Sequence, residues 1–164
     1  MGGLVCQLVA TQATLRRLIL IAPSPVNGMR ENGMRMVRRH PYTLLVVFFR
    51  HSFLRLYRSP RVRRSLLYHA GTPEAVIASA GNTLVEESWQ AGNQMNTILP
   101  DVARVRCPVS ILGATEDFMV SPGSIEATAL AYGVKPVFIP ASGHMIQSEV
   151  PRRLAAVLQP ILTG

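Results

Sequence analysis

Three short apolar runs, separated by stretches of helical periodicity, constrain the fold of this chain more than any other feature. The runs are LILIA at residues 18–22, VSILGA at 109–114 and VFIPA at 137–141. Their apolar residues are largely continuous rather than alternating, which is typical of strands that are covered on both faces. Helical patterns lie between them, so the sequence predicts an α/β fold built on a parallel sheet.

Signals for helix ends follow the second and third runs. Ser121 and Pro122 predict the N-cap and first residue of a helix over 121–132, which Gly133 is expected to end. A last helix is expected over residues 151–158, opened by a proline. The order of strand, helix, strand and helix is the one that a parallel sheet requires.

The segment between the first and second runs is too long for an ordinary crossover between strands. Four apolar residues within it recur at helical spacing: Leu45, Phe49, Phe53 and Leu56. They predict one amphipathic helix over residues 42–58, with arginines on its other side. Thr72, followed by Pro73 and Glu74, predicts the N-cap of a further helix. A helical insertion of this kind commonly covers a site at the carboxyl ends of parallel strands.

Positive charge is concentrated in the same insertion. The formal net charge is +8, and ten of the sixteen arginines lie between Arg30 and Arg64, where Glu31 is the only acid. Such an excess can attract nucleic acid, an anionic membrane or acidic substrates. We interpret it as a solvated face, and a basic protein that binds nucleic acid or anionic membrane is kept as an alternative. The aromatic residues lie on the apolar stripe rather than among the arginines, which argues against base stacking.

Cysteine usage and hydropathy indicate the compartment. Cys6 and Cys107 stand apart, without the spacing of a metal site or a disulfide framework, which suits a reducing cytoplasm. The chain begins without a secretory signal, and its longest apolar run, residues 44–49, is far shorter than the ~20 residues of a membrane span. We expect a cytoplasmic protein with no transmembrane segment, and nothing in the sequence implies a metal or a cofactor.

Two residues with acid–base chemistry follow predicted strands. Asp117 comes after the second strand in ILGATEDFMV, and His144 comes after the third in IPASGHM. Both therefore leave the carboxyl ends of parallel strands, where such folds bind ligands. A carboxylate that is hydrogen-bonded to an imidazole fixes its tautomer and stabilises the imidazolium, so the pair is a candidate general base with its orienting acid.

The order of these segments resembles the second half of an α/β-hydrolase. In that family the triad acid lies in a G-x-x-D segment after the seventh strand, which matches the stretch ending at Asp117 with one extra residue. The base lies in a G-H pair after the eighth strand, which matches Gly143 and His144. Glu149, two residues before a proline, also resembles family members. The resemblance implies a partial α/β-hydrolase fold, with strands six to eight of a mostly parallel sheet.

Domain organisation follows from the same resemblance. Residues 1–27 and 100–164 would form the core portion of the hydrolase, and residues 28–99 a helical cap or lid. Because the sheet would begin at its sixth strand, the strand over residues 18–22 would become an exposed edge, through which the chain could self-associate.

The first three residues resemble the end of the family's nucleophile elbow. The elbow is commonly G-x-S-x-G, and a frequent version continues S-M-G-G. Met1, Gly2 and Gly3 match the residues that follow the serine. The resemblance implies that the serine is missing from this chain. It also implies that the backbone N–H of Met1 is one donor of the oxyanion hole. At Gly3, it implies packing on the strand that is too close for a side chain. A helix over residues 3–13 would follow.

The implied activity is hydrolysis of a small, largely apolar ester or similar substrate. A Ser-His-Asp triad would form an acyl-enzyme, with Asp117 and His144 as the acid and base that this chain supplies. Its partner would be a small-molecule substrate rather than nucleic acid, and the chain alone would be inactive. A non-catalytic, truncated binding module on the same fold is a second alternative.

Overall fold

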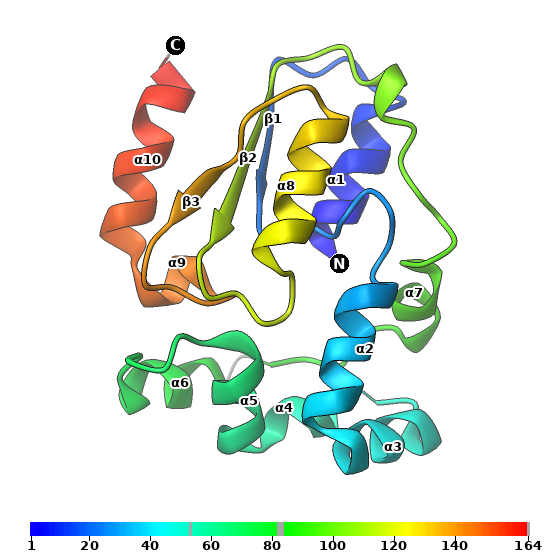
Figure 1. Ribbon diagram of the computed structural model, residues 1–164, viewed down its shortest axis with the longest axis vertical. Helices are drawn as coiled ribbons and strands as arrows, with labels where there is room; N and C mark the ends of the chain where they lie inside the picture. Colours follow the sequence, from blue (N-terminus) through cyan, green and yellow to red (C-terminus); the bar gives the residue numbers. More distant parts are fainter. Residues whose placement is uncertain (53, 82–83, 164) are drawn as a thin grey trace.

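The computed structural model describes residues 1–52, 54–81 and 84–163 (Figure 1). The chain starts with helix α1 (Gly2–Ala10) and strand β1 (Leu18–Ile21). A run of helices follows: α2 (Arg30–Arg39), α3 (Pro41–Arg50), α4 (Leu54–Arg58), α5 (Pro60–Leu67), α6 (Glu74–Gly81) and α7 (Trp89–Gln94). The remainder comprises a 3₁₀ turn (Val102–Arg104), β2 (Val109–Ala114), α8 (Pro122–Ala131), β3 (Val137–Ile139), α9 (Ile146–Glu149) and α10 (Pro151–Thr163).

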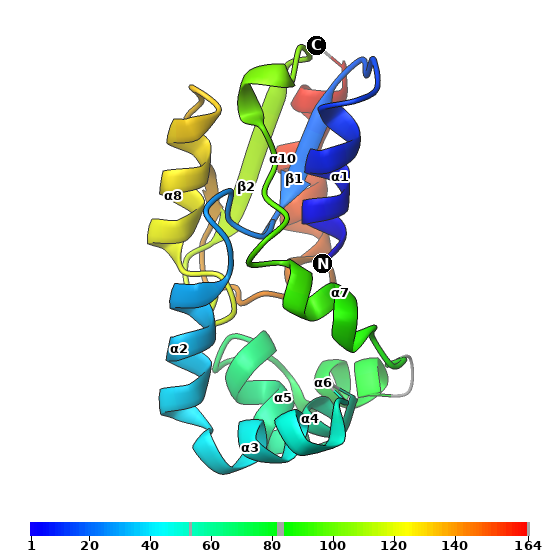
Figure 2. The same ribbon diagram turned by 90° about the vertical axis from the view of Figure 1, so that its right-hand side faces the viewer.

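The three predicted strands form one parallel sheet in the order β1-β2-β3, as the sequence predicts. Leu18 is paired with Val109 across the first ladder, and Leu112 with Val137 across the second. All three strands point toward helices α2 to α7, which gather beyond the carboxyl ends of the strands (Figures 1 and 2). A side chain that follows any of these strands therefore faces the helical insertion.

Helices cover both faces of the sheet. On one face α8 packs on β1 and β2 through a cluster that joins Leu20 and Ile111 to Ile125. On the other face α10 packs on β2 and β3, where Leu154 joins Leu112 and Ile139 (Figure 1). Burial on two faces explains why the strand sequences are continuously apolar.

The signals for helix ends match α8 closely. The hydroxyl of Ser121 accepts a hydrogen bond from the N–H of Ser124 at 3.1 Å, and Gly133 has a φ of +67° just past the helix. Two other ends differ from prediction. Helix α1 ends at Ala10 rather than residue 13, and α10 continues through Pro160 to Thr163. The added turn of α10 brings Ile161 against the apolar cluster on its face of the sheet.

The prediction of one amphipathic helix over residues 42–58 is wrong. The helix is interrupted at His51, whose φ of +49° is left-handed, so α3 and α4 are separate. Leu45 and Phe49 are 55% and 73% exposed, whereas Val47 is buried in the cluster that forms the core of the insertion. Within α3, the side that carries Val47 packs inward, and not the side of Leu45 and Phe49. Phe53 and the side chain of Leu56 lie outside the described residues.

Thr72 does not cap α6, although that helix begins at the predicted place. Helix α6 starts at Glu74, and the N–H of Val76 bonds to the carbonyl of Pro73. The hydroxyl of Thr72 instead donates to the carboxylate of Glu149, from a distant part of the chain, at 2.5 Å. A tertiary hydrogen bond has replaced the local one.

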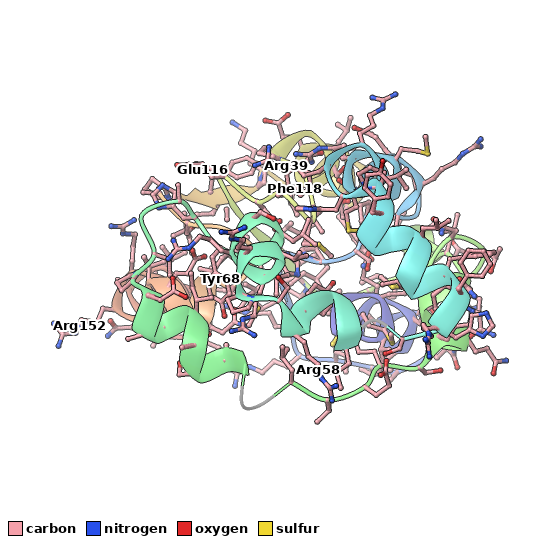
Figure 3. The ribbon with its side chains drawn as sticks, turned by 90° about the horizontal axis from the view of Figure 1, so that it is seen from below. Arg39, Arg58, Tyr68, Glu116, Phe118 and Arg152 are labelled. Carbon is pink, nitrogen blue, oxygen red and sulfur yellow. The ribbon has the colours of Figure 1, made fainter. Side chains whose placement is uncertain are left out.

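The arginine-rich segment is only partly a solvated face. Arg63 is buried, at 5% exposure, and Arg64 forms an ion pair with Glu74 at 2.7 Å. The guanidinium groups of Arg35 and Arg39 lie 4.9 Å and 5.5 Å from the ring centre of Phe118, at cation–π distance. Figure 3 labels Arg39 and Phe118, which lie close together. Exposed arginines remain on several helices of the insertion: Arg30, Arg38, Arg50, Arg58 and Arg61.

Both cysteines are free thiols, with Cys6 exposed and Cys107 half-buried. Within the described ranges, no helix combines the length and the apolar character that are needed to cross a bilayer. The longest, α10, has 13 residues and carries two arginines near its start.

The exposed edge of β1 leads us to expect that copies of the chain associate with one another. Among the described strands, β1 has β2 on one side and no partner on the other, and Ile21 on it is 37% exposed. Unpaired apolar edges recruit other strands. We expect the 164-residue chain to self-associate in a concentration-dependent way, measured by light scattering after size exclusion. Ile21→Lys should weaken association, whereas Leu130→Lys, at a 79% exposed site on α8, should not. A monomer at every concentration would contradict this expectation.

Candidate active site

The two predicted acid–base residues meet beyond the ends of their strands. The loop after β2 carries Asp117, and the loop after β3 carries His144. Nδ1 of His144 lies 2.8 Å from Oδ2 of Asp117. The carboxylate side chain is fully buried, while the imidazole is 26% exposed. With its proton on Nδ1 donated to Asp117, the ring keeps Nε2 free to accept a proton from a substrate-side group.

Backbone contacts hold the loop of Asp117 in place. Its second carboxylate oxygen, Oδ1, accepts a hydrogen bond from the N–H of Val120 at 2.9 Å. The N–H of Glu116 donates to the carbonyl of Ser142, which joins the loop of the acid to that of the histidine. Both carboxylate oxygens of Asp117 are thus occupied, and the residue is positioned to orient the imidazole rather than to react itself.

The carboxylate of Glu149 ties the histidine loop to the insertion. Its Oε2 accepts from the N–H of Gly143 at 2.7 Å, and its Oε1 accepts from the N–H of His69 at 2.6 Å and from the hydroxyl of Thr72. In the sequence, Glu149 stands out only as a family-like residue, and no role was expected for it. The structure places it directly behind the loop that presents His144.

Gly143 is in close contact with the backbone of the insertion. A Cβ at this position would lie 2.7 Å from the N of His69 and from the carbonyl carbon of Tyr68. Real Cβ atoms essentially never approach other atoms this closely. Glycine therefore lets residues 68–69 lie directly against the histidine loop, which explains the G-H pair in physical terms.

A second link joins the insertion to the acid loop. Nδ1 of His69 accepts from the N–H of Gly71 at 3.0 Å, so the proton of the neutral ring is on Nε2. That nitrogen lies 3.2 Å from Oε1 of Glu116, the residue before Asp117. Residues 68–72 thus contact both the loop that carries Asp117 and the loop that carries His144.

Two cavities open beside His144. One, of about 250 Å³, is rich in methionines: Met1, Met29, Met36, Met95 and Met119. The other, of about 310 Å³, includes Arg63 and Tyr68 in its wall. Tyr57 and Glu87 line both cavities. Met1 and Met119 line both cavities, as does His144. An imidazole shared by two pockets can reach a group that spans both of them.

Met1 and Gly3 lie where α1 starts, at the same end of the sheet (Figure 1). Met1 borders both cavities, and its carbonyl accepts the N–H of Leu4. A Cβ on Gly3 would lie 2.8 Å from the Cα of Pro23, just past β1. The close packing at Gly3 that the family resemblance implies is confirmed. Among the described residues, no three His, Cys, Asp or Glu side chains gather in a way that could hold a metal ion.

Comparison with known proteins identifies a family for this chain. The profile of the family described as "Alpha/beta hydrolase family" matches residues 1–157. A comparison with curated protein sequences finds no match. The fold is similar to that of the enol-lactonase from Burkholderia xenovorans LB400, with 16% identity, a TM-score of 0.71, and coverage of 100% of this chain and 63% of that one.

Two further solved structures are similar. The thermophilic esterase from Thermogutta terrifontis has 20% identity and a TM-score of 0.65, over 99% of this chain and 61% of that one. A protein assigned as the non-heme bromoperoxidase BpoC of Mycobacterium tuberculosis H37Rv has 12% identity and a TM-score of 0.73, over 98% of this chain and 63% of that one. The chain therefore spans less than two thirds of the length of these proteins. By its sequence profile and its fold, it belongs to the alpha/beta hydrolase family.

Proposed function

We propose that this chain supplies the base and the acid of a Ser-His-Asp triad that hydrolyses carboxylic esters. The observation that carries the proposal is the 2.8 Å contact between the imidazole of His144 and the buried carboxylate of Asp117, beside two cavities at the carboxyl ends of the strands. A buried carboxylate bonded to a partly exposed imidazole is the arrangement that a general base requires.

In the proposed reaction, a serine that precedes Met1 attacks the ester carbonyl while Nε2 of His144 takes its proton. The imidazolium is stabilised by Asp117 and then gives that proton to the leaving alkoxide. In the second half of the reaction, Nε2 of His144 takes a proton from a water molecule, which attacks the acyl carbonyl. The bond between the acyl group and the serine oxygen then breaks, the imidazolium returns its proton to the serine, and the acid product leaves. The N–H of Met1 donates to the oxyanion, since it belongs to the residue after the nucleophile in the family's elbow. We call the chain together with the sequence translated upstream of Met1 the extended protein.

A small, largely apolar acyl or alcohol group suits the first cavity. Its methionine side chains are unbranched and flexible, so they can adapt to ligands of different shape. We propose that residues 28–99 act as the cap over this cavity, because Met29, Met36 and Met95 all come from that segment. The proposal is tested by assaying short-chain 4-nitrophenyl esters with the extended protein, which should turn them over, and with the 164-residue chain, which should not.

Glu149 gives a test of how the histidine loop is positioned. In the extended protein, Glu149→Gln keeps one acceptor oxygen but leaves one of the bound donors, such as the N–H of Gly143, without its partner. We expect kcat to fall about tenfold because a lost hydrogen bond to a charged group has this order of effect. Glu74→Gln, at an exposed ion pair on α6, should leave kcat within about twofold. Unchanged turnover in Glu149→Gln would show that its contacts do not position His144.

A further inference from the structure

The second cavity contains two buried polar groups that the proposed chemistry does not use. Arg63 is 5% exposed and Tyr68 is 6% exposed. Nη1 of Arg63 donates to the carbonyl of Tyr57 at 3.0 Å, but Nε is buried and has no hydrogen-bond partner among the described residues. The buried hydroxyl of Tyr68 also has none within the described part of the chain. Both side chains line the cavity that reaches His144.

A buried guanidinium without a carboxylate beside it is costly, and each unbonded polar atom adds to the cost. Within the ranges that the structure describes, the ion pairs do not include Arg63. The nearby carboxylate of Glu149 is occupied by the N–H groups of Gly143 and His69. Glu87 lines the same cavity but is exposed and forms no ion pair with Arg63. The positive charge in the cavity wall is therefore not neutralised by the described chain.

The guanidinium is also held in a fixed place. A Cβ on Gly81 would lie 2.6 Å from Nη1 and 2.7 Å from Nη2 of Arg63, so the group packs directly on the backbone of α6. Burial raises the pKa of Tyr68 above its ordinary value of 10, with Arg63 opposing and Glu149 adding to this effect. The hydroxyl consequently stays protonated at neutral pH and can act as a donor. Figure 3, seen from the cap side, places Tyr68 well inside the molecular outline.

We infer that the second cavity binds a carboxylate of the substrate, paired with the guanidinium of Arg63 and hydrogen-bonded by the hydroxyl of Tyr68. This inference rests on the proposed hydrolase function and narrows it: the substrate class is an ester that carries a carboxylate away from the scissile bond. The carboxylate end lies against Arg63, the reacting carbonyl lies near His144, and the apolar remainder lies in the methionine-rich cavity. A planar guanidinium suits a carboxylate better than a lysine would.

Calorimetric titration of the extended protein tests the site. It compares the affinity for pentanoate with that for pentanamide, which has the same length and no charge. Pentanoate should bind at least about tenfold more tightly, and Tyr68→Phe or Arg63→Gln should weaken it by about ten- to a hundredfold. Arg61→Gln, at an exposed site on α5, is the matched control and should bind normally. Tyr68→Phe should keep its melting temperature, because the hydroxyl that it loses has no partner in the described chain. Equal binding of the two ligands, or normal pentanoate binding by Tyr68→Phe, would overturn the inference.

Turnover separates this inference from the proposed function. The extended protein should prefer mono-4-nitrophenyl glutarate to 4-nitrophenyl pentanoate in kcat/KM, and Arg63→Gln should remove this preference by lowering kcat/KM for the glutarate ester. Hydrolysis of both esters with no preference would overturn the carboxylate site and leave the hydrolase function standing. Hydrolysis of neither ester, together with selective pentanoate binding, would overturn the hydrolase function and leave the anion site standing.

Discussion

Replacing His144 with alanine in the extended protein is expected to lower kcat for a short-chain ester by about 10⁴–10⁶-fold. Without the imidazole no group takes the proton of the attacking serine, and the remaining catalysis comes from binding and the oxyanion hole. Asp117→Asn should lower kcat by roughly 10⁴-fold, because an amide no longer holds the ring in the tautomer that leaves Nε2 free. Initial rates under saturating substrate give both values.

The double variant distinguishes one functional unit from two separate effects. Because Asp117 acts through His144, combining the two changes should cost little more than His144→Ala alone. His51→Gln, an exposed histidine at the end of α3, is the matched control and should keep kcat within about twofold. Losses that multiply, or near-normal turnover by His144→Ala, would show that these residues do not form a triad.

Gly143→Ala is expected to lower kcat about a hundredfold without removing any catalytic group. The added methyl would lie 2.7–2.9 Å from backbone atoms of Tyr68 and His69, and backbone cannot move aside as a flexible side chain can. The loop that carries His144 must shift, and displacement of about 1 Å costs a factor of this order. The variant should also melt at a lower temperature.

A glycine in open surroundings provides the control for that variant. A methyl group added at Gly123 on α8 would meet no atom closer than 4.0 Å, and alanine is the better helix former. Gly123→Ala should keep full activity and melt at the same or a slightly higher temperature. If Gly143→Ala behaves in the same way, the close approach of the insertion to the histidine loop is not what positions the base.

The sheet and the acid–base pair were predictable because local sequence determines them. Continuous apolar runs identify strands that are buried on two faces, and the parallel order follows from the helices between them. Once the strands are parallel, residues such as Asp117 and His144 that follow neighbouring strands must emerge at one edge. The helix after Ser121 was predictable for the same reason, since its cap bonds are formed within four residues.

The insertion was less predictable because its structure depends on tertiary contacts. Histidine adopts positive φ more often than most residues, but most histidines do not, so residue type alone does not place the left-handed break at His51. The hydroxyl of Thr72 had a local role available and took a bond to Glu149 from 77 residues away instead. Neither composition nor periodicity predicts that Arg63 is buried. Its neighbour Arg64 is the same residue type, yet it is half-exposed and forms an ion pair.

Covalent labelling of the extended protein tests the central claim most directly. A fluorophosphonate reacts with a serine only when a base removes the proton of its hydroxyl, and the modified peptide is identified by mass spectrometry. We predict that one serine is modified, the residue immediately before Met1 in the sequence. His144→Ala should lower the rate of this labelling by at least about 10³-fold, and His51→Gln should leave the rate unchanged. Labelling elsewhere, labelling at the same rate in His144→Ala, or no labelling of a protein that hydrolyses esters would contradict the account.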